Sequence, residues 1–470
     1  MRIERDTLGD VAVPDEALWG AQTQRAIENY PISGLREHPI FIRAFILLKK
    51  AAALANRELG AMDAAIADAI VNACDELLAN EAKYRDQFRV DVFQAGAGTS
   101  FNMNVNEVIA NLANPTRGTY DPVRPNDHVN MAQSTNDVVP TAIRVAALLL
   151  LPALWDALDD LAGALAERGE AFKDVIKSGR THLQDAVPVT LGQEFNAYSE
   201  AVARATRMLV SAATELREVG IGGTAAGTGM NAPRGYRHVV IRHLNEMEPD
   251  LELMPIDDLR EAMQSQLPIA NVSGALRNLA LELTRIANDL RLLASGPQTG
   301  LAEIILPAVQ PGSSIMPGKV NPSMLECLNQ VCFHVIGADT AIAFAVQAGQ
   351  LELNVMMPVI AFNVLLSMQI LTNATNVLAD KCVKGITANR EMCEYWVERS
   401  AALATALAPQ IGYAKAAEIS KRSVKEGVLI RELVKQEHVL PDDQLDDVLD
   451  LKKMTEIGVP GGKHGVSAGG

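Results

Sequence analysis

The sequence predicts an all-α protein built around a central bundle of long helices, and three observations support this class. Apolar residues recur at helical spacing in five blocks, at 140–177, 191–219, 269–295, 323–350 and 355–380. Aromatic residues make up only 4% of the chain against 48% apolar residues, so small aliphatic side chains build the core and let helices approach closely. Strand signals are scarce, with one small edge ribbon suggested at 11–13.

Along the chain, these elements fall into three predicted domains. Residues 1–138 form an N-terminal, mostly helical domain in which Gly, Pro and Asn interrupt short helical patterns. Residues 139–390 contain the five long blocks, and residues 391–470 form a small, more charged helical domain whose tail from Gly458 is expected to fray. Several of the long blocks are apolar over more than one face, so we expect an oligomer that buries the outer faces.

Composition indicates which binding partners and which cellular compartment suit this chain. The net charge is -15 and no basic stripe is present, which argues against a nucleic-acid partner. The five cysteines are scattered without CxxC spacing, so reduced thiols are expected rather than disulfides or a zinc site. The start of the chain is charged, and the most apolar stretch, Ala142–Leu154, contains Arg144 and Pro152 and is short for a membrane span. We expect a soluble cytoplasmic protein with no membrane partner.

Four polar segments between the helical blocks contain residues suited to binding a small anion. They cover residues 96–104, 133–137, 179–185 and 295–322. Their Ser, Thr and Asn side chains, with one His and one Lys, offer the directed donors that a small dicarboxylate requires. Any one of these segments taken alone is more typical of a helix cap or a turn. Lys319 differs, because Pro317-Gly318 and Asn321-Pro322 restrict the backbone on both sides of it.

The glycine-rich segments match neither common nucleotide-binding loop. A P-loop has four residues between its first Gly and the Gly-Lys pair, followed by Ser or Thr. Here five residues separate Gly312 from Gly318, and Val320 follows Lys319. Residues 227–229 lack the third glycine and the preceding strand of a dinucleotide-binding fingerprint. No cofactor is expected, and no residue in these segments requires a metal. Activation by a divalent ion is an alternative that the sequence leaves open.

The eleven residues from Gly312 to Pro322, GSSIMPGKVNP, resemble the signature loop of the fumarase/aspartase superfamily. The segments at 19–23, 28–32 and 222–231 also resemble its members, and the similarity thins only beyond about Met454. The resemblance implies a three-domain helical subunit with a central bundle of long helices. It also implies a homotetramer in which each active site takes loops from three subunits.

Within the superfamily, the resemblance favours the aspartate ammonia-lyases over the fumarate hydratases. Thr135 stands where fumarases typically carry Ser, and residues 181–188 and 347–356 look aspartase-like. Against this, Trp19-Gly20 resembles fumarase, and Met357 stands where aspartases usually carry Glu. The implied reaction is the reversible deamination of L-aspartate to fumarate and ammonia. Interconversion of malate and fumarate is the close alternative.

A third class is a structural, delta-crystallin-like protein that keeps the fold without activity. Such a protein would tolerate loss of the reactive residues in the signature loop. Ser313 and Lys319 are both present, which disfavours this class.

The resemblance also implies a role for each residue that matches the family's active site. Ser313 would be the base that removes the β-proton to give an enediolate (aci-carboxylate). His182 and Glu326 would be the other two catalytic residues, with Glu326 orienting the ring of His182. The implied substrate-binding residues are Thr181, Lys319 and Asn321 at the carboxylate that gains charge, and Thr99, Ser134, Thr135 and Asn136 at the other end.

Overall fold

The computed structural model describes residues 1–462 and is mainly helical, which confirms the predicted all-α class. The end of the predicted frayed tail, residues 463–470, lies outside the described residues. Strands in the described part form four two-stranded sheets and nothing larger.

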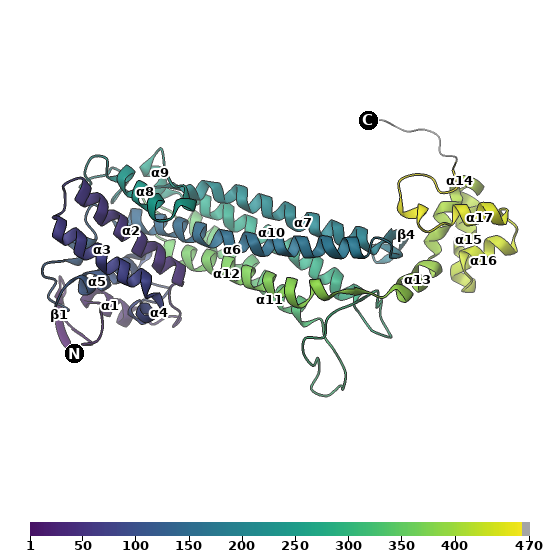
Figure 1. The fold of residues 1–470 in the computed structure, drawn as a ribbon, viewed down its shortest axis with the longest axis horizontal. Helices are drawn as coiled ribbons and strands as arrows, with labels where there is room; N and C mark the ends of the chain where they lie inside the picture. Colours follow the sequence, from purple (N-terminus) through teal and green to yellow (C-terminus); the bar gives the residue numbers. More distant parts are fainter. Residues whose placement is uncertain (463–470) are drawn as a thin grey trace. The chain divides into compact units, whose positions relative to one another are not determined.

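Five long helices correspond to the five predicted blocks (Figure 1). They are α6 (Thr135–Ala171), α7 (Leu191–Ala213), α10 (Leu267–Leu293), α11 (Ser323–Gln347) and α12 (Met357–Lys381). Pro152 lies inside α6 without ending it. The proline ring removes one helical hydrogen bond, but the rest of the helix continues past it to Ala171.

Three of the long helices, α6, α11 and α12, are long and apolar enough to cross a membrane by length and composition. The prediction that Arg144 and Pro152 leave no stretch of sufficient length was therefore wrong. In α6, 67% of the apolar window is buried inside the structure. Arg144 is buried with it and donates a hydrogen bond to the carbonyl of Glu218. Protein packing therefore surrounds most of this apolar window.

The described chain forms two compact units. Unit 1 comprises residues 1–156, 205–281 and 330–373, and unit 2 comprises 157–204, 282–329 and 374–462. Each of the five long helices begins in one unit and ends in the other. The predicted domain boundaries at 138/139 and 390/391 stay predictions.

Unit 1 contains the N-terminal elements. An antiparallel hairpin of β1 (Arg2–Asp6) and β2 (Gly9–Val13) includes the ribbon expected at 11–13. Helices α1 (Ala21–Asn29), α2 (Pro39–Glu58), α3 (Ala64–Ala79) and α5 (Thr99–Ala113) follow. Aromatic side chains join α2 to α5, because the ring of Phe101 lies 5.2 Å from that of Phe45 and 5.7 Å from that of Phe41. These contacts fix where α5 begins.

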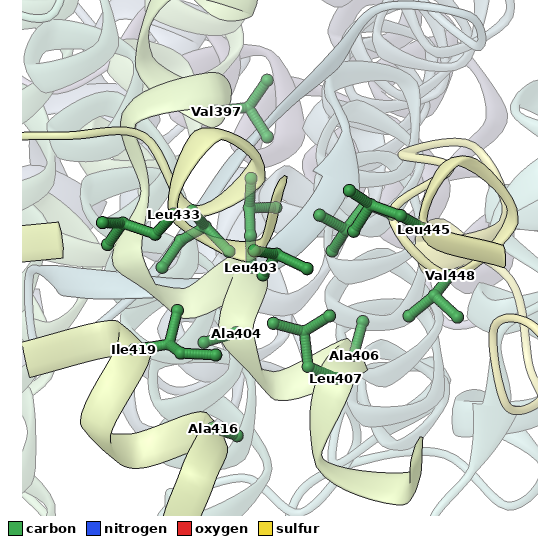
Figure 2. Close-up of a cluster of buried hydrophobic side chains, with 13 residues drawn as sticks. Val397, Leu403, Ala404, Ala406, Leu407, Ala416, Ile419, Leu433, Leu445 and Val448 are labelled. Atoms are coloured by element: carbon green, nitrogen blue, oxygen red, sulfur yellow. The ribbon is translucent and has the colours of Figure 1, made fainter. Parts of the chain in front are cut away.

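The carboxyl-terminal helices of unit 2 surround a separate apolar core (Figure 2). They are α13 (Arg390–Arg399), α14 (Ala408–Ile411), α15 (Tyr413–Glu426), α16 (Ile430–Gln436) and α17 (Asp442–Val448), with a 3-10 helix at Ala401–Leu407. Leu407, Leu433 and Leu445 are fully buried in this core. Ile176 packs against the same core, so the core also anchors the strand that starts at Ile176.

That strand belongs to a hairpin that the sequence interpretation missed. Residues 179–185 were expected to connect two helices, but β3 (Ile176–Thr181) and β4 (Gln184–Thr190) pair antiparallel. His182 and Leu183 form the two-residue turn, with φ of 54° and 60°. Turns of this kind require positive φ and match the twist of the flanking strands. The helical pattern in the preceding block stops at Ala171 rather than near 177.

Candidate active site

Thr99 opens α5 in unit 1, directly after a tight glycine-rich turn. Gly98 has φ of 84°, in the left-handed region, and a Cβ added to it would lie 3.1 Å from the side chain of Val139 in α6. A larger residue would therefore push apart the starts of α5 and α6. The side chain of Thr99 is exposed at the positive end of the α5 dipole, a favourable position for an anion.

The start of α6 carries the other three predicted residues of unit 1. The Oγ of Ser134 accepts from the backbone N–H of Asn136 (3.2 Å), and the Asp137 carboxylate accepts from the N–H of Ser134 (2.9 Å). This reciprocal pattern is a helix-capping box. Thr135 is the first residue of α6, and its Oγ1 accepts from the side-chain amide of Asn102 (3.3 Å). Helix capping and substrate binding are thus compatible roles for this segment.

Asp137 also fixes the segment at 222–231, which the sequence comparison linked to the superfamily. Its Oδ2 accepts from the backbone N–H of Gly222 (3.0 Å) and of Thr224 (2.9 Å). The side-chain amide of Asn136 donates to the carbonyl of Ala225 (2.8 Å). Burial raises the pKa of Asp137 to about 6 although these N–H groups favour its charged form. The carboxylate therefore holds two loops of unit 1 together.

A buried lysine holds the loop that precedes α6. Lys49 of α2 is fully buried, and its Nζ donates to the side-chain oxygens of Asn130 and Gln133, each at 3.0 Å. Asn102, which contacts Thr135, also donates to Asn130 (3.2 Å). Burial lowers the pKa of Lys49 to about 7. A hydrogen-bonded chain thus connects this amine to Thr135.

In unit 2, the residues from 312 to 322 form a loop closed on itself between α10 and α11 (Figure 1). The N–H of Gly312 donates to the carbonyl of Lys319 (2.7 Å), and the side-chain amide of Asn321 donates to the carbonyl of Gly312 (2.6 Å). A Cβ on Gly312 would lie 2.6 Å from that carbonyl of Lys319. Only glycine therefore permits the closure. Asn321, which was predicted to bind substrate, has a structural role in this loop.

Ser313 faces backbone donors of its own loop. Its Oγ accepts from the N–H of Ile315 (3.2 Å) and of Met316 (2.9 Å). Donors aimed at a hydroxyl oxygen stabilise its deprotonated form. Lys319 is exposed, and no carboxylate among residues 1–462 lies within ion-pair distance of its ammonium group. The loop thus presents an oxygen that can act as a base and a cation available for an anionic ligand.

The remaining predicted residues of unit 2 lie at the hairpin turn and at the start of α11. Thr181 and His182 are exposed at the tip of the β3–β4 hairpin. Glu326 is half-buried in the first turn of α11, where a carboxylate is favoured by the helix dipole. Its predicted pairing with His182 stays a prediction.

The ten predicted residues therefore divide between the two units. Thr99, Ser134, Thr135 and Asn136 lie in unit 1, and Thr181, His182, Ser313, Lys319, Asn321 and Glu326 lie in unit 2. Within unit 1 the structure brings together the starts of α5 and α6, and within unit 2 one closed loop carries Ser313, Lys319 and Asn321.

No group of three or more His, Cys, Asp or Glu in residues 1–462 is placed to hold a metal ion. All five cysteines are free thiols, and only Cys327 is exposed. Burial raises the pKa of the Cys393 thiol to about 12, which makes this thiol a poor nucleophile.

Sequence reasoning missed Lys49 and Asp137 as supports of the site. Lys49 lies four residues after Phe45 and eight after Phe41, on the apolar face of α2. That spacing could have revealed a buried cation. Asp137 was quoted in its segment, and the spacing of three residues from Ser134 is the capping-box signal that assigns it a role.

Comparison with known proteins supports the all-α fold and the interpretation of the loop at 312–322. A family model described as lyase matches residues 9–337, and one described as the fumarase C carboxyl terminus matches 403–456. The chain belongs to the fumarase/aspartase superfamily of lyases. It is 47% identical over 464 residues to the aspartate ammonia-lyase of Bacillus subtilis, covering 98% of this chain and 97% of that enzyme.

Two solved structures are similar along nearly the full chain. A cobalt-bound fumarate lyase/delta crystallin from Brucella melitensis is 47% identical with a TM-score of 0.93, over 97% of this chain and 99% of that one. The class II fumarase of Schistosoma mansoni has the same TM-score and coverage at 35% identity. Backbone similarity thus extends to a class II fumarase, while sequence identity is higher to the aspartate ammonia-lyase of Bacillus subtilis (47%) than to that fumarase (35%).

Proposed function

We propose that this protein is an aspartate ammonia-lyase, a carbon–nitrogen lyase that converts L-aspartate reversibly to fumarate and ammonia. The observation that carries the proposal is the loop at 312–322, where Ser313 meets two backbone donors and Lys319 offers a free cation. The 47% identity to the aspartate ammonia-lyase of Bacillus subtilis supports the choice of ammonia over water as the leaving group. The preference read from the sequence is therefore confirmed by the curated relatives.

The reaction starts at the carbon next to the carboxylate that gains charge. Ser313, with its oxygen stabilised by the N–H groups of Ile315 and Met316, takes the β-proton. The electron pair of that C–H bond moves into the adjacent carboxylate and gives an enediolate with two negative charges. Lys319 and Asn321, with Thr181 and His182, are assigned to this end, where preorganised positive groups lower the barrier most.

The second step breaks the C–N bond. The enediolate returns its electron pair to form the carbon–carbon double bond, and the protonated amine leaves as neutral ammonia. A protonated amine requires no strong general acid at this end, whereas loss of hydroxide from malate does. Thr99, Ser134, Thr135 and Asn136 are assigned to the other carboxylate and the amine, at the positive ends of α5 and α6.

We further propose that the ten residues join in one active site that different subunits complete in a cytoplasmic homotetramer. Large apolar side chains on α11 support an oligomer, because Phe333 is 56% exposed and Phe344 is 65% exposed in the single chain. An exposed apolar face of this kind is typical of a subunit contact.

The direct test of the activity uses the absorbance of fumarate. The purified chain should form fumarate from L-aspartate, and it should form it much more slowly from L-malate at the same concentration. Fumarate formation from malate alone would favour the hydratase. Failure with both substrates would contradict the lyase assignment.

A further inference from the structure

A buried ion cluster lies at the base of the β3–β4 hairpin in unit 2, outside the residues assigned so far. Its centre is Glu303, whose side chain is 0% exposed. The Glu303 carboxylate accepts from Arg180 at 2.9 and 3.1 Å and lies 3.2 Å from the Nζ of Lys177. A carboxylate this deeply buried is stable only when cations or donors compensate its charge.

Both cations come from β3, although they stand three residues apart. Side chains at that spacing point to opposite faces of a regular strand. The pairing with β4 is irregular between Ser178 and Gly179, and a Cβ on Gly179 would lie 2.5 Å from the carbonyl oxygen of Val187. An irregularity of this kind bends the strand, and here both Lys177 and Arg180 reach the same carboxylate.

Hydrogen bonds also hold the backbone around Glu303 in place. Its N–H donates to the carbonyl of Leu293 at the end of α10, and its carbonyl accepts from the N–H of Asn389, both at 2.9 Å. The next two residues form β7 (Ile304–Ile305), which pairs with β8 (Thr387–Ala388). The backbone of Glu303 is thus held in place on both sides. Its carboxylate pairs with Arg180, the residue directly before Thr181.

We infer that Glu303 is a positioning residue for the hairpin tip that carries Thr181 and His182. It holds Arg180, and through Arg180 the turn, without itself contacting the substrate. The kinetic part of this inference rests on the proposed function. Because the tip is assigned to the carboxylate that gains charge in the transition state, its displacement affects kcat more than KM.

The test compares two glutamates that differ in their partners. Glu303→Gln keeps the side-chain size but removes the charge that both cations share. Glu194→Gln is the matched control, because Glu194 pairs with Lys177 (2.9 Å) but not with Arg180. We expect Glu303→Gln to lower kcat up to about 100-fold, the effect of a displacement of about 1 Å, with a smaller change in KM. Glu194→Gln should stay within about threefold of the wild type.

Hydrogen exchange provides a readout that is independent of activity. Backbone amides of residues 176–190 should exchange faster in Glu303→Gln than in the wild type or in Glu194→Gln. If Glu303→Gln does not fold, Arg180→Gln replaces it, because this variant frees the turn and keeps the pair of Lys177 with Glu303. The expectation for it is the same loss of kcat and the same faster exchange.

The outcomes separate the inference from the proposed function. Equal kinetics and equal exchange for Glu303→Gln and Glu194→Gln would overturn the positioning role. Faster exchange limited to Glu303→Gln, in a protein whose wild type forms no fumarate from aspartate, would support the positioning of the hairpin while contradicting the lyase proposal.

Discussion

Replacement of Ser313 by alanine should lower kcat for fumarate formation by roughly 10²–10⁴-fold, the usual contribution of a positioned proton acceptor. The variant removes the side-chain oxygen that accepts hydrogen bonds from the N–H groups of Ile315 and Met316. The hydrogen bonds that close the loop at Gly312 do not involve this side chain, so the loop should keep its conformation. The measurement is fumarate absorbance at saturating aspartate, with the melting temperature checked in parallel.

Ser314→Ala is the comparison within the same loop, because it removes a neighbouring hydroxyl that is exposed. We expect the loss from Ser313→Ala to be at least about tenfold larger than the loss from Ser314→Ala. If Ser314→Ala caused the larger loss, the base would have to be Ser314.

Replacement of Lys319 by methionine should lower kcat/KM by roughly 10²–10³-fold, as for the loss of one preorganised group at a developing negative charge. The ammonium group has no carboxylate partner within ion-pair distance among residues 1–462. Its removal should therefore cost little stability. Steady-state kinetics with aspartate measure the loss.

Two controls accompany this variant. Lys319→Arg keeps the charge but changes its geometry, so it should retain more activity than Lys319→Met. Lys173→Met removes an exposed lysine paired with Glu170 elsewhere in unit 2 and should leave kcat/KM unchanged. A Lys319→Met enzyme with activity equal to that of Lys173→Met would refute the assigned role.

Sequence patterns predicted the long helices well, for a physical reason. Apolar side chains repeat at helical spacing over more than twenty residues in α10, α11 and α12, and such long repeats have few alternatives. The β3–β4 hairpin was missed because its turn has no glycine and relies on positive φ at His182 and Leu183.

The loop at 312–322 could be predicted because its functional residues lie close together in the sequence. Gly312 hydrogen-bonds to Lys319 and Asn321, and Ser313 hydrogen-bonds to Met316, all within ten residues. One continuous motif therefore specifies these contacts. Glu303 and Arg180 are separated by 123 positions, and nothing near either residue predicts their contact. Lys49 likewise contacts Gln133 only because α2 packs beside the loop before α6.

We propose that residues of unit 1 and unit 2 act in one active site that different subunits complete. Mixing two inactive variants tests it most directly: Ser313→Ala, altered in unit 2, and a Thr99→Val/Ser134→Ala double variant, altered in unit 1. After equal amounts are unfolded and refolded together, about one quarter of the wild-type activity should return, because random mixing rebuilds a quarter of the shared sites intact. Each variant refolded alone should stay inactive. Mixed oligomers that form but show no recovered activity would contradict a site shared between subunits.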